Sequence, residues 1–216
     1  ILAHPDVILE AARAYEAARR AEEEKGAAAA RAASRQEVER DPTSPVAGNP
    51  DGAVTVVEFF DYQCGYCKRV LPVVQELLKT DQKVRYVFKE FPILGPESVI
   101  AAKAALAVWT VAKDKYLPFH AALMQLRGGL TEDKIMAAAK DVGLDVDRLR
   151  AAMADPAIVQ ALNRNLELGR KINVNGTPAF IIGGRVIPGA IDLETMRKEI
   201  AAARAGCGRP KPGLFA

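Results

Sequence analysis

Cysteine is scarce in this chain of 216 residues, which contains three cysteines, two histidines and one tryptophan. An odd, low number of cysteines excludes a small scaffold held together by several disulfides. No stretch is long and apolar enough to predict a helix that crosses a membrane. The net charge of +3, with 26% charged residues, gives no reason to expect nucleic acid or an anionic membrane surface as a partner. Half of the residues are hydrophobic, which is enough for one ordinary domain with an appendage.

The first 40 residues differ in composition from the rest of the chain. Asp6–Arg40 is rich in Ala, Glu and Arg and lacks proline, which predicts one long helix or two helices broken near Gly26. A helix this polar belongs to no large core, so we expect residues 4–40 to pack on another copy or to extend into solvent. The alternative for the alanine-rich part after Tyr15 is packing on its own domain. The prolines within 41–46 predict a linker. The apolar stripe of the helix is small and is made by Val7, Ile8, Leu9 and Tyr15.

Residues 53–88 have the pattern of a β-α-β unit. Ala53–Phe60 is a run of Val, Thr and Phe, which is typical of a strand buried on both faces. Cys64–Lys79 has helical patterning, and Lys83–Phe88 is a second strand rich in Val and aromatic residues. Such a unit implies two parallel strands joined by a right-handed crossover.

A block of helices is predicted after the second strand. It runs from Pro96 to about Gly169 in several pieces, with breaks near Asp114, Gly128–Gly129, Gly143 and Asp155–Pro156.

The last part of the chain predicts a hairpin and a final helix. Ala179–Ile182 and Arg185–Ile187 are short apolar runs joined by Gly183–Gly184, which is a turn signal. Asp192 is suited to cap a helix that ends near Ala205, and the proline-rich residues after it predict a loose tail.

Two of the three cysteines are spaced to form a redox pair. A disulfide needs its two Cα atoms roughly 5–6 Å apart, and positions i and i+3 in the first turn of a helix satisfy this distance. Cys64 follows a strand-to-helix loop, where free N–H groups and the helix dipole favour a thiolate. Cys67 lies one turn further in, so we expect it to be more buried and to resolve the mixed disulfide.

The alternatives for this pair are half of a zinc site and two inert core thiols. Structural zinc needs four ligands, and the remaining candidates, His4, His120 and Cys207, are distant and unpaired in the sequence. We therefore expect no metal and no cofactor. Cys207 is interpreted as a free terminal thiol, and His120 as a packed or surface histidine. Lys89 and Glu90 are interpreted as a solvated pair, and the alternative is that they set the charge near the site.

The residues around the pair resemble a known family. Val56–Lys68, with the sequence VVEFFDYQCGYCK, is similar to the active-site region of the DsbA-like proteins of bacterial envelopes. Pro72, five residues after Cys67, matches the helix-kinking proline of the thioredoxin superfamily. Asn175–Ala179 looks like the cis-proline loop of that superfamily. The resemblance covers residues 46 to 205.

The resemblance implies an α/β protein with a thioredoxin fold, a DsbA-like inserted helical subdomain and an N-terminal helical extension. The implied parts are an extension at 1–40, a linker at 41–46, a core formed by 47–92 and 174–206, an insertion at 93–173 and a tail at 207–216. The extension lies outside the DsbA resemblance and is similar to the oligomerising extensions of ScsC- and DsbC-type relatives.

The resemblance also implies roles for single residues. Glu58, six residues before the first cysteine, matches an acid that exchanges a proton with the second cysteine, and burial of a carboxyl raises its pKa. Its alternative is a carboxylate at a strand end that reaches solvent. Thr177 and Pro178 match the loop that presents backbone to an extended substrate, and the alternative for Pro178 is a strand-edge proline. Gly65 and Tyr66, between the cysteines, are expected to touch the substrate and to tune the thiolate. The alternative for Tyr66 is ordinary surface packing.

Oxidation, isomerisation and reduction of disulfides use the same residues. Gly65–Tyr66 and the threonine before Pro178 resemble the DsbC-type isomerase pattern, which favours an isomerase or reductase, whereas the domain as a whole resembles the DsbA-type oxidase. A client-binding chaperone or scaffold is the hypothesis of another class, and a glutathione-transferase-like enzyme is a third. Expected partners are proteins with cysteines, a redox partner protein and a second copy through residues 4–40. The family implies the periplasm or cell envelope, with any export signal outside this chain.

Overall fold

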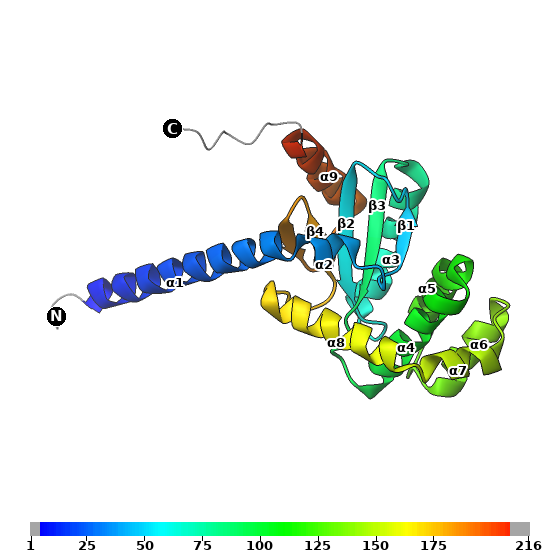
Figure 1. The fold of residues 1–216 in the computed structure, drawn as a ribbon. Helices are drawn as coiled ribbons and strands as arrows, with labels where there is room; N and C mark the ends of the chain where they lie inside the picture. Colours follow the sequence, from blue (N-terminus) through cyan, green and yellow to red (C-terminus); the bar gives the residue numbers. More distant parts are fainter. Residues whose placement is uncertain (1–4, 208–216) are drawn as a thin grey trace.

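The computed structural model describes residues 5–207, in which a sheet is surrounded by helices and one long helix reaches away from it (Figure 1). The predictions for the tail at 208–216 and for the thiol of Cys207 lie outside the described part. The strands are β1 Val46–Gly48, β2 Val54–Phe60, β3 Val84–Glu90, β4 Ala179–Ile182 and β5 Arg185–Pro188. The helices are α1 Pro5–Ala33, α2 Arg35–Arg40, α3 Gly65–Thr80, α4 Pro96–Val111, η1 Lys113–Lys115, α5 Tyr116–Gln125, α6 Glu132–Asp141, α7 Val146–Met153, α8 Pro156–Lys171 and α9 Leu193–Cys207.

The five strands form one mixed sheet in the order β1-β3-β2-β4-β5. β2 and β3 pair in parallel and are connected along the chain by α3, so the predicted β-α-β unit is confirmed. β4 pairs antiparallel with β2, and it forms the predicted hairpin with β5. The hairpin turn needs Gly183 and Gly184, because their φ angles of 58° and 80° lie in the left-handed region that favours glycine.

The short edge strand β1 was not predicted from the sequence. It follows the proline-rich segment and pairs antiparallel with β3, with Val46 opposite Val87 and Gly48 opposite Arg85. Three residues are too few to show a two-residue period, and their strand conformation comes from the open edge of β3. The segment expected to be a linker therefore runs directly into the sheet.

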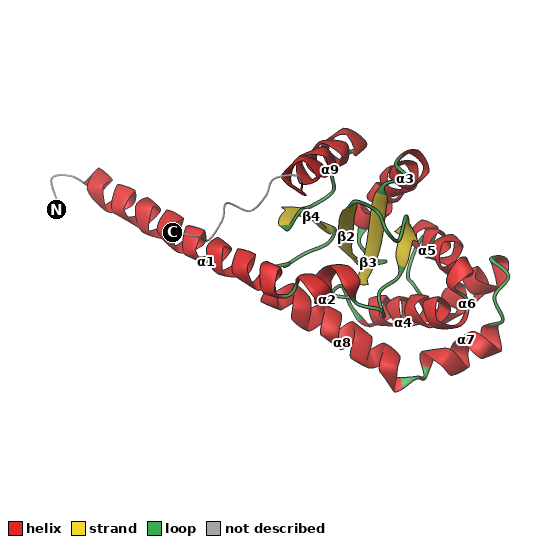
Figure 2. Ribbon diagram, turned by 45° about the horizontal axis from the view of Figure 1, so that its top comes forward, coloured by secondary structure: helices red, strands yellow, loops and turns green. Residues whose placement is uncertain are grey.

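Helices cover both faces of the sheet, as Figure 2 shows with α3 and α9 on one side and α2 and α8 on the other. Because side chains alternate along a strand, β2 contributes Val56 and Phe60 to the core under α3, and Val57 and Phe59 to the core under α8. The prediction that β2 is buried on both faces is confirmed.

The predicted block of helices between β3 and β4 is confirmed as α4 to α8, with the breaks in the predicted places. Thr131, Asp145 and Asp155 cap α6, α7 and α8 by accepting hydrogen bonds from backbone N–H groups within the first turn. The block packs beside the sheet and joins the same core through α4 and α5. The block also contacts the region where β2 passes into α3, because Ser98 of α4 donates to Asp61 and Lys68 of α3 donates to the Leu126 carbonyl.

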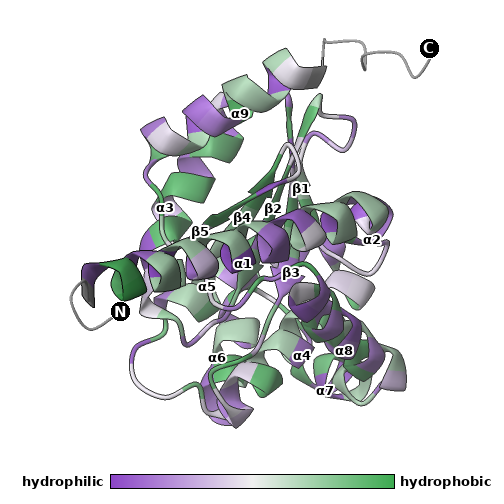
Figure 3. Cartoon of the chain, turned by 90° about the vertical axis from the view of Figure 1, so that its left-hand side faces the viewer, coloured by the Kyte–Doolittle hydropathy of each residue, from purple (hydrophilic) through white to green (hydrophobic). Residues whose placement is uncertain are grey.

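The N-terminal stretch is helical as predicted, but its break differs from the expected position. Gly26 lies inside α1, where an added Cβ would meet no atom within 4 Å, and the chain turns at Ser34 instead. One exposed glycine costs a helix only about 1 kcal/mol, which the surrounding Ala, Glu and Arg residues tolerate. Residues 6–26 are exposed. Figure 3 shows a strongly hydrophobic turn at the N-terminal end of α1, where Val7, Ile8 and Leu9 are exposed.

The last part of this stretch packs on the domain, which is the alternative given above for the alanine-rich part after Tyr15. Val38 of α2 is buried in the core that contains Val57, Phe59 and Val87. Arg31 is buried and donates from Nε to the carbonyl oxygen of Gly184, at 3.0 Å. Since alanines leave room for close approach of backbones, the alanine-rich end of α1 fits against the hairpin turn.

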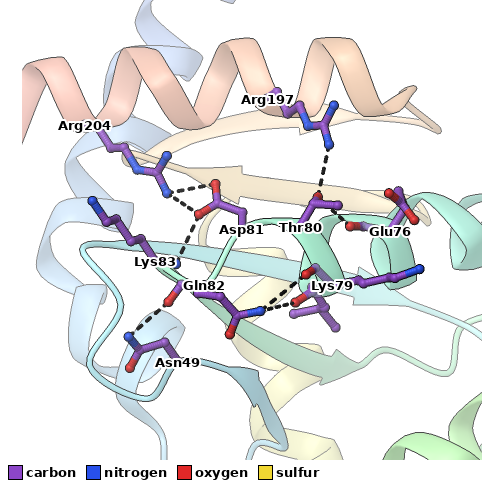
Figure 4. A network of polar contacts seen from close by, with 10 residues as sticks. Asn49, Glu76, Lys79, Thr80, Asp81, Gln82, Lys83, Arg197 and Arg204 are labelled. Atoms are coloured by element: carbon purple, nitrogen blue, oxygen red, sulfur yellow. Dashed lines mark hydrogen bonds and ion pairs between the residues drawn. The ribbon is translucent and has the colours of Figure 1, made fainter.

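Polar contacts attach α9 to the far end of α3 and to the loop before β3, as Figure 4 shows. The Arg204 guanidinium donates to both carboxylate oxygens of Asp81, at 2.8 and 2.9 Å, and this contact is the main reason that the pKa of Asp81 is lowered. Arg197 donates to the hydroxyl of Thr80 at 3.0 Å. The predicted cap of α9 is confirmed, because Asp192 Oδ1 accepts from the Thr195 N–H at 2.8 Å.

Candidate active site

The two cysteines of the CxxC pair lie where β2 passes into α3. The Cys64 N–H donates to the Asp61 carbonyl at 3.1 Å, and the Cys64 carbonyl accepts from the Lys68 N–H at 3.1 Å. Cys64 therefore occupies the N-cap position of α3, and the free N–H groups of the first helical turn lie beside it. Cys67 lies inside the first turn, and both cysteines are free thiols.

The two thiols differ in burial in the predicted order. Cys67 is 1% exposed and Cys64 is 7% exposed. A nucleophile is expected to be exposed, but Cys64 is buried. The loop that contains Thr177 lies over it, and the Cys64 thiol donates to the carbonyl oxygen of Thr177 at 3.2 Å. A residue 113 positions further along the chain thus covers the first cysteine.

The loop that covers Cys64 contains a cis peptide bond between Thr177 and Pro178. The carbonyl of Pro178 accepts from the Gly189 N–H at 2.8 Å, which holds the loop to the end of β5. A cavity of about 250 Å³ lies along this loop, lined by Thr177, Pro178, Val186 and Pro188 among others. The residues of β5 that line this cavity belong to an edge strand of the sheet.

Glu58 lies in the middle of β2, opposite Phe88 of β3 and Phe180 of β4. It is 3% exposed, so the alternative of a carboxylate that reaches solvent at a strand end is wrong. Burial raises the pKa of Glu58 to about 7, although the Tyr86 hydroxyl opposes this by donating to Oε2 at 2.7 Å. The carboxyl is therefore poised to exchange a proton near neutral pH.

Glu58 affects the proton of the Cys67 thiol. Burial raises the pKa of the Cys67 thiol, and the charge of Glu58 is the second cause. A hydrogen bond with the Cys64 thiol raises it further, while the N–H of Asp61 favours the thiolate. Cys67 consequently keeps its proton until a base accepts it.

Between the cysteines, Gly65 and Tyr66 face outward. A side chain at Gly65 would meet no atom within 4 Å, so the backbone of this first helical turn is open to an approaching chain. Tyr66 is 59% exposed, and the Arg69 guanidinium carbon lies 4.1 Å from the centre of its ring. Pro72 lies inside α3, one turn beyond Cys67.

Two charged residues were assigned wrongly from the sequence. Lys89 and Glu90 are both buried, and they do not form a solvated pair. Because successive strand residues point to opposite faces, Lys89 donates to Asp41 Oδ2 at 3.0 Å, whereas Glu90 accepts from Tyr62 and Tyr116 on the other face. The only signal for this burial in the sequence was that two adjacent residues of opposite charge follow an apolar strand segment without a turn residue between them.

The expectation for His120 is confirmed, since it is packed in the core and bonded to Tyr62. Within residues 5–207, no group of three or more His, Cys, Asp or Glu side chains is arranged to hold a metal ion. No helix in the described part is long and apolar enough to cross a membrane.

A CxxC pair at the start of the helix of a β-α-β unit, facing a cis-proline loop, defines the class of thioredoxin-fold thiol–disulfide oxidoreductases. A family model described as DSBA-like thioredoxin domain matches residues 55–201. The chain belongs to this DSBA-like thioredoxin domain family, so the predicted fold class is confirmed.

Three solved structures illustrate the similarity. A thioredoxin-like oxidoreductase from Silicibacter pomeroyi is 40% identical, with a TM-score of 0.76, and the match covers 79% of this chain and 98% of that one. The thiol-disulfide exchange protein alpha-DsbA2 from Wolbachia pipientis is 35% identical, with a TM-score of 0.78 and coverage of 83% and 97%. Proteus mirabilis ScsC in a compact conformation is 28% identical, with a TM-score of 0.76 and coverage of 96% and 94%.

Curated relatives include longer proteins. The Na(+)/H(+) antiporter NhaA 1 of Salinispora arenicola is 31% identical over 163 residues, which are 74% of this chain and 25% of that protein. The chain thus spans about a quarter of the length of the first such relatives. A probable disulfide bond formation protein D of Bacillus cereus is 27% identical over 164 residues, which are 71% of this chain and 75% of that protein.

The substitution Glu58→Gln is expected to slow disulfide exchange on the order of 100-fold, because an amide keeps the shape of the carboxyl but accepts no proton. The rate of wild-type exchange should change with a midpoint near pH 7, and the variant should lack this change. Stopped-flow exchange with a small disulfide across pH measures both. Glu76→Gln on the exposed side of α3 is the matched control. A variant profile that overlays the wild-type curve removes Glu58 from the mechanism.

The same substitution should change the pH dependence of stability. The pKa of Glu58 is about 7 in the folded protein against an ordinary value of 4.5, so ionisation of Glu58 costs folding free energy as the pH rises through this interval. Glutamine does not ionise. Denaturant unfolding should therefore show that the free energy of unfolding of Glu58→Gln, relative to that of wild type, increases between pH 4.5 and 7, by about 3 kcal/mol at most. Above pH 7 this difference should stay constant.

Proposed function

We propose that this chain is an enzyme of protein thiol–disulfide exchange, with Cys64, Cys67 and Glu58 as its catalytic residues. The observation that supports this most directly is the position of Cys64, at the N-cap of α3 and 3.2 Å from the Thr177 carbonyl oxygen. A free cysteine at a helix N-terminus is a nucleophile, and the adjoining loop is placed to hold the chain that carries the target sulfur.

Each exchange step conserves electrons and protons. The Cys64 thiolate attacks a substrate disulfide, which forms a Cys64–substrate disulfide and releases one substrate thiolate. The Cys67 thiol then gives its proton to the Glu58 carboxylate, and the resulting Cys67 thiolate attacks the Cys64 sulfur. This attack breaks the mixed disulfide, releases the second substrate thiolate and leaves Cys64 and Cys67 oxidised. The reverse sequence oxidises a substrate dithiol.

Gly65, Tyr66, Thr177 and Pro178 are proposed to bind the substrate. Gly65 and Tyr66 are exposed beside the first cysteine, and the cavity along Thr177 and Pro178 continues to the edge strand β5. An extended segment lying along this loop would bring its cysteine to Cys64, with backbone contacts that do not depend on the client's sequence. Such binding suits an enzyme that acts on many unfolded proteins.

The direction is proposed to be isomerisation or reduction. The support is the Gly65–Tyr66 sequence between the cysteines and the exposed apolar end of α1, which offers a surface for association with a second copy. Oxidation remains the second candidate, since the chain belongs to the DSBA-like family. The proposed place of action is the periplasm or cell envelope, with proteins that contain cysteines as substrates and a separate protein to restore the redox state.

Refolding of ribonuclease distinguishes these directions. Reduced enzyme is mixed with scrambled, fully oxidised ribonuclease, and oxidised enzyme is mixed with reduced ribonuclease. An isomerase restores activity to the scrambled substrate without added oxidant, whereas an oxidase acts mainly in the second mixture. The double variant Cys64→Ser, Cys67→Ser is the control for both. If wild type and this control refold ribonuclease equally, the chain is not a thiol–disulfide oxidoreductase.

A further inference from the structure

A second buried carboxyl, Glu90, lies on the same face of the sheet as Glu58. In the parallel register of β2 and β3, Glu58 stands opposite Phe88 and Phe60 stands opposite Glu90. Residues two apart in a strand share a face, so the two glutamates lie under the same layer of helices, separated along the sheet by aromatic rings. Glu90 is 1% exposed.

The side chain of Glu90 is held by hydroxyl groups from two other elements. Its Oε1 lies 3.1 Å from the Tyr62 hydroxyl and 3.2 Å from the Tyr116 hydroxyl. The Tyr62 hydroxyl also lies 3.0 Å from Nδ1 of His120 on α5. Oε2 of Glu90 is buried and has no hydrogen-bond partner among the described residues. Tyr62 thus connects the carboxyl to the imidazole.

The charges around Glu90 favour its neutral form. Burial is the first cause of the raised pKa of Glu90, the hydrogen bonds from Tyr62 and Tyr116 oppose it, and the negative charges of Asp61 and Glu58 raise it further. The neighbouring ammonium of Lys89 points to the opposite face of the sheet, toward Asp41. From α8, Asn165 donates only to the backbone carbonyl of Glu90. A carboxylate here would be desolvated, and in the described part of the chain the bonds to it come from neutral hydroxyls, which favours the protonated form.

His120 does not supply that missing positive charge. Burial lowers the pKa of His120 to about 3, and burial is also the first cause of the raised pKa of Glu90. A neutral imidazole and a neutral carboxylic acid leave no buried charge. The Tyr62 hydroxyl makes two hydrogen bonds, one to Glu90 and one to His120. It donates its own proton in one bond and accepts a proton from the acid or the imidazole in the other, so no charged group is needed.

Tyr62 also belongs to the loop that carries Cys64. This loop is fixed at its other residues, because Asp61 accepts from the Ile93 and Leu94 N–H groups at 2.9 and 3.0 Å and from the Ser98 hydroxyl at 2.7 Å. Tyr62 is the residue of the loop that reaches inward, under α3. Its position therefore affects where the next residues place the sulfur of Cys64.

We propose that Glu90 is a protonated acid at neutral pH and that it acts with His120, through Tyr62, as a positioning unit for Cys64. The three side chains hold the loop so that Cys64 meets both the N-terminus of α3 and the Thr177 carbonyl. A thiolate depends on oriented dipoles more than a disulfide does, so a loosened loop disfavours the reduced form. This inference rests on the proposed exchange activity of Cys64 and Cys67.

The equilibrium of the dithiol with glutathione tests the positioning. Tyr62→Phe keeps the ring but removes the hydroxyl that joins Glu90 to His120. We expect this variant to shift the equilibrium toward the disulfide by about fivefold, the factor that corresponds to one buried hydrogen bond. Alkylation of Cys64 should slow by a similar factor. Glu90→Leu also removes the bond between Tyr62 and Glu90, together with that from Tyr116, but keeps the bond between Tyr62 and His120. It provides a second measurement if Tyr62→Phe folds poorly.

A control variant that is destabilised far from Cys64 shows whether loss of stability alone shifts the glutathione equilibrium. Val84 is fully buried at the opposite end of β3 from Glu90, so Val84→Ala should lower the melting temperature and leave the glutathione equilibrium unchanged. If Tyr62→Phe and Glu90→Leu also lower the melting temperature without moving the equilibrium, the cluster is only structural and the positioning role is wrong. A wild-type protein that does not exchange with glutathione overturns the proposed function instead.

Glu90→Gln tests the protonation state. Glutamine is neutral, as we propose for Glu90, and its amide can still bond to both tyrosines. The pH profile of exchange in this variant should overlay the wild-type profile, with the same midpoint near 7 that Glu58 sets. If Glu90 were ionised, its removal would lower the pKa of Glu58 and move the midpoint to lower pH. A midpoint that moves in this direction overturns the claim of a protonated Glu90.

Discussion

Cys64→Ser is expected to abolish thiol–disulfide exchange completely, since a serine hydroxyl forms no disulfide. Cys67→Ser should instead accumulate a mixed disulfide between Cys64 and the substrate, because the thiol that releases the substrate is absent. The difference follows from the geometry, in which Cys64 caps α3 and Cys67 is 1% exposed behind it. Insulin reduction measures the loss, and non-reducing gel electrophoresis with mass spectrometry identifies the trapped complex.

Alkylation of the reduced wild type assigns the two roles independently. Cys64 is expected to react first, because a thiolate at the start of α3 benefits from the free N–H groups there, whereas burial raises the pKa of Cys67. Peptide mapping after brief treatment with a small alkylating reagent identifies the modified residue. Preferential labelling of Cys67, or mixed disulfides through Cys67 in Cys64→Ser, would reverse the assignment.

A chain shortened to begin at Gly26 is expected to be monomeric and to keep its thiol exchange, while losing the ability to refold scrambled ribonuclease. Residues 1–25 are removed, of which 6–25 are described as exposed and make no part of the core. Val7, Ile8 and Leu9 expose apolar surface at the far end of α1, which a second copy would cover. Light scattering on both chains measures the mass.

The starting residue matters for this experiment. A chain beginning at Ser44 would also lose Val38, whose burial stabilises the fold by about 2 kcal/mol, and the bonds of Arg31 to the β4–β5 turn. We expect that shorter form to melt at a lower temperature. In the full chain, replacing Val7, Ile8 and Leu9 with serine should give the same monomer without deleting anything. A full-length chain that is already monomeric contradicts the oligomer and favours the oxidase.

The sequence predicted the elements that are defined by local pattern. The β-α-β unit follows from two apolar runs around a helical one, and the hairpin follows from Gly183–Gly184. The place of Cys64 also follows locally, because a strand-to-helix loop fixes which residue caps the helix. The cis peptide before Pro178 was implied by resemblance and not by the residues themselves.

Features made by distant parts of the chain were not predicted. β1 exists because β3 offers an open edge, and no pattern in three residues reports that. Glu90 looks like half of a charge pair in the sequence, yet its burial depends on Tyr62, Tyr116 and His120, which come from other elements. Charged residues in a strand are assigned correctly only when the helices over each face are known.

The fixed base of α1 determines what the exposed part of that helix does. Arg31 and Val38 anchor its end to the domain, and 21 residues, 6–26, continue beyond it as one exposed helix. At 1.5 Å per residue this arm is about 30 Å long, comparable to the diameter of a small folded protein. A rigid spacer of this length keeps any joined copies apart. If two copies join at Val7, Ile8 and Leu9 as proposed, their dithiols would be held apart, with room between them for a client that has already begun to fold.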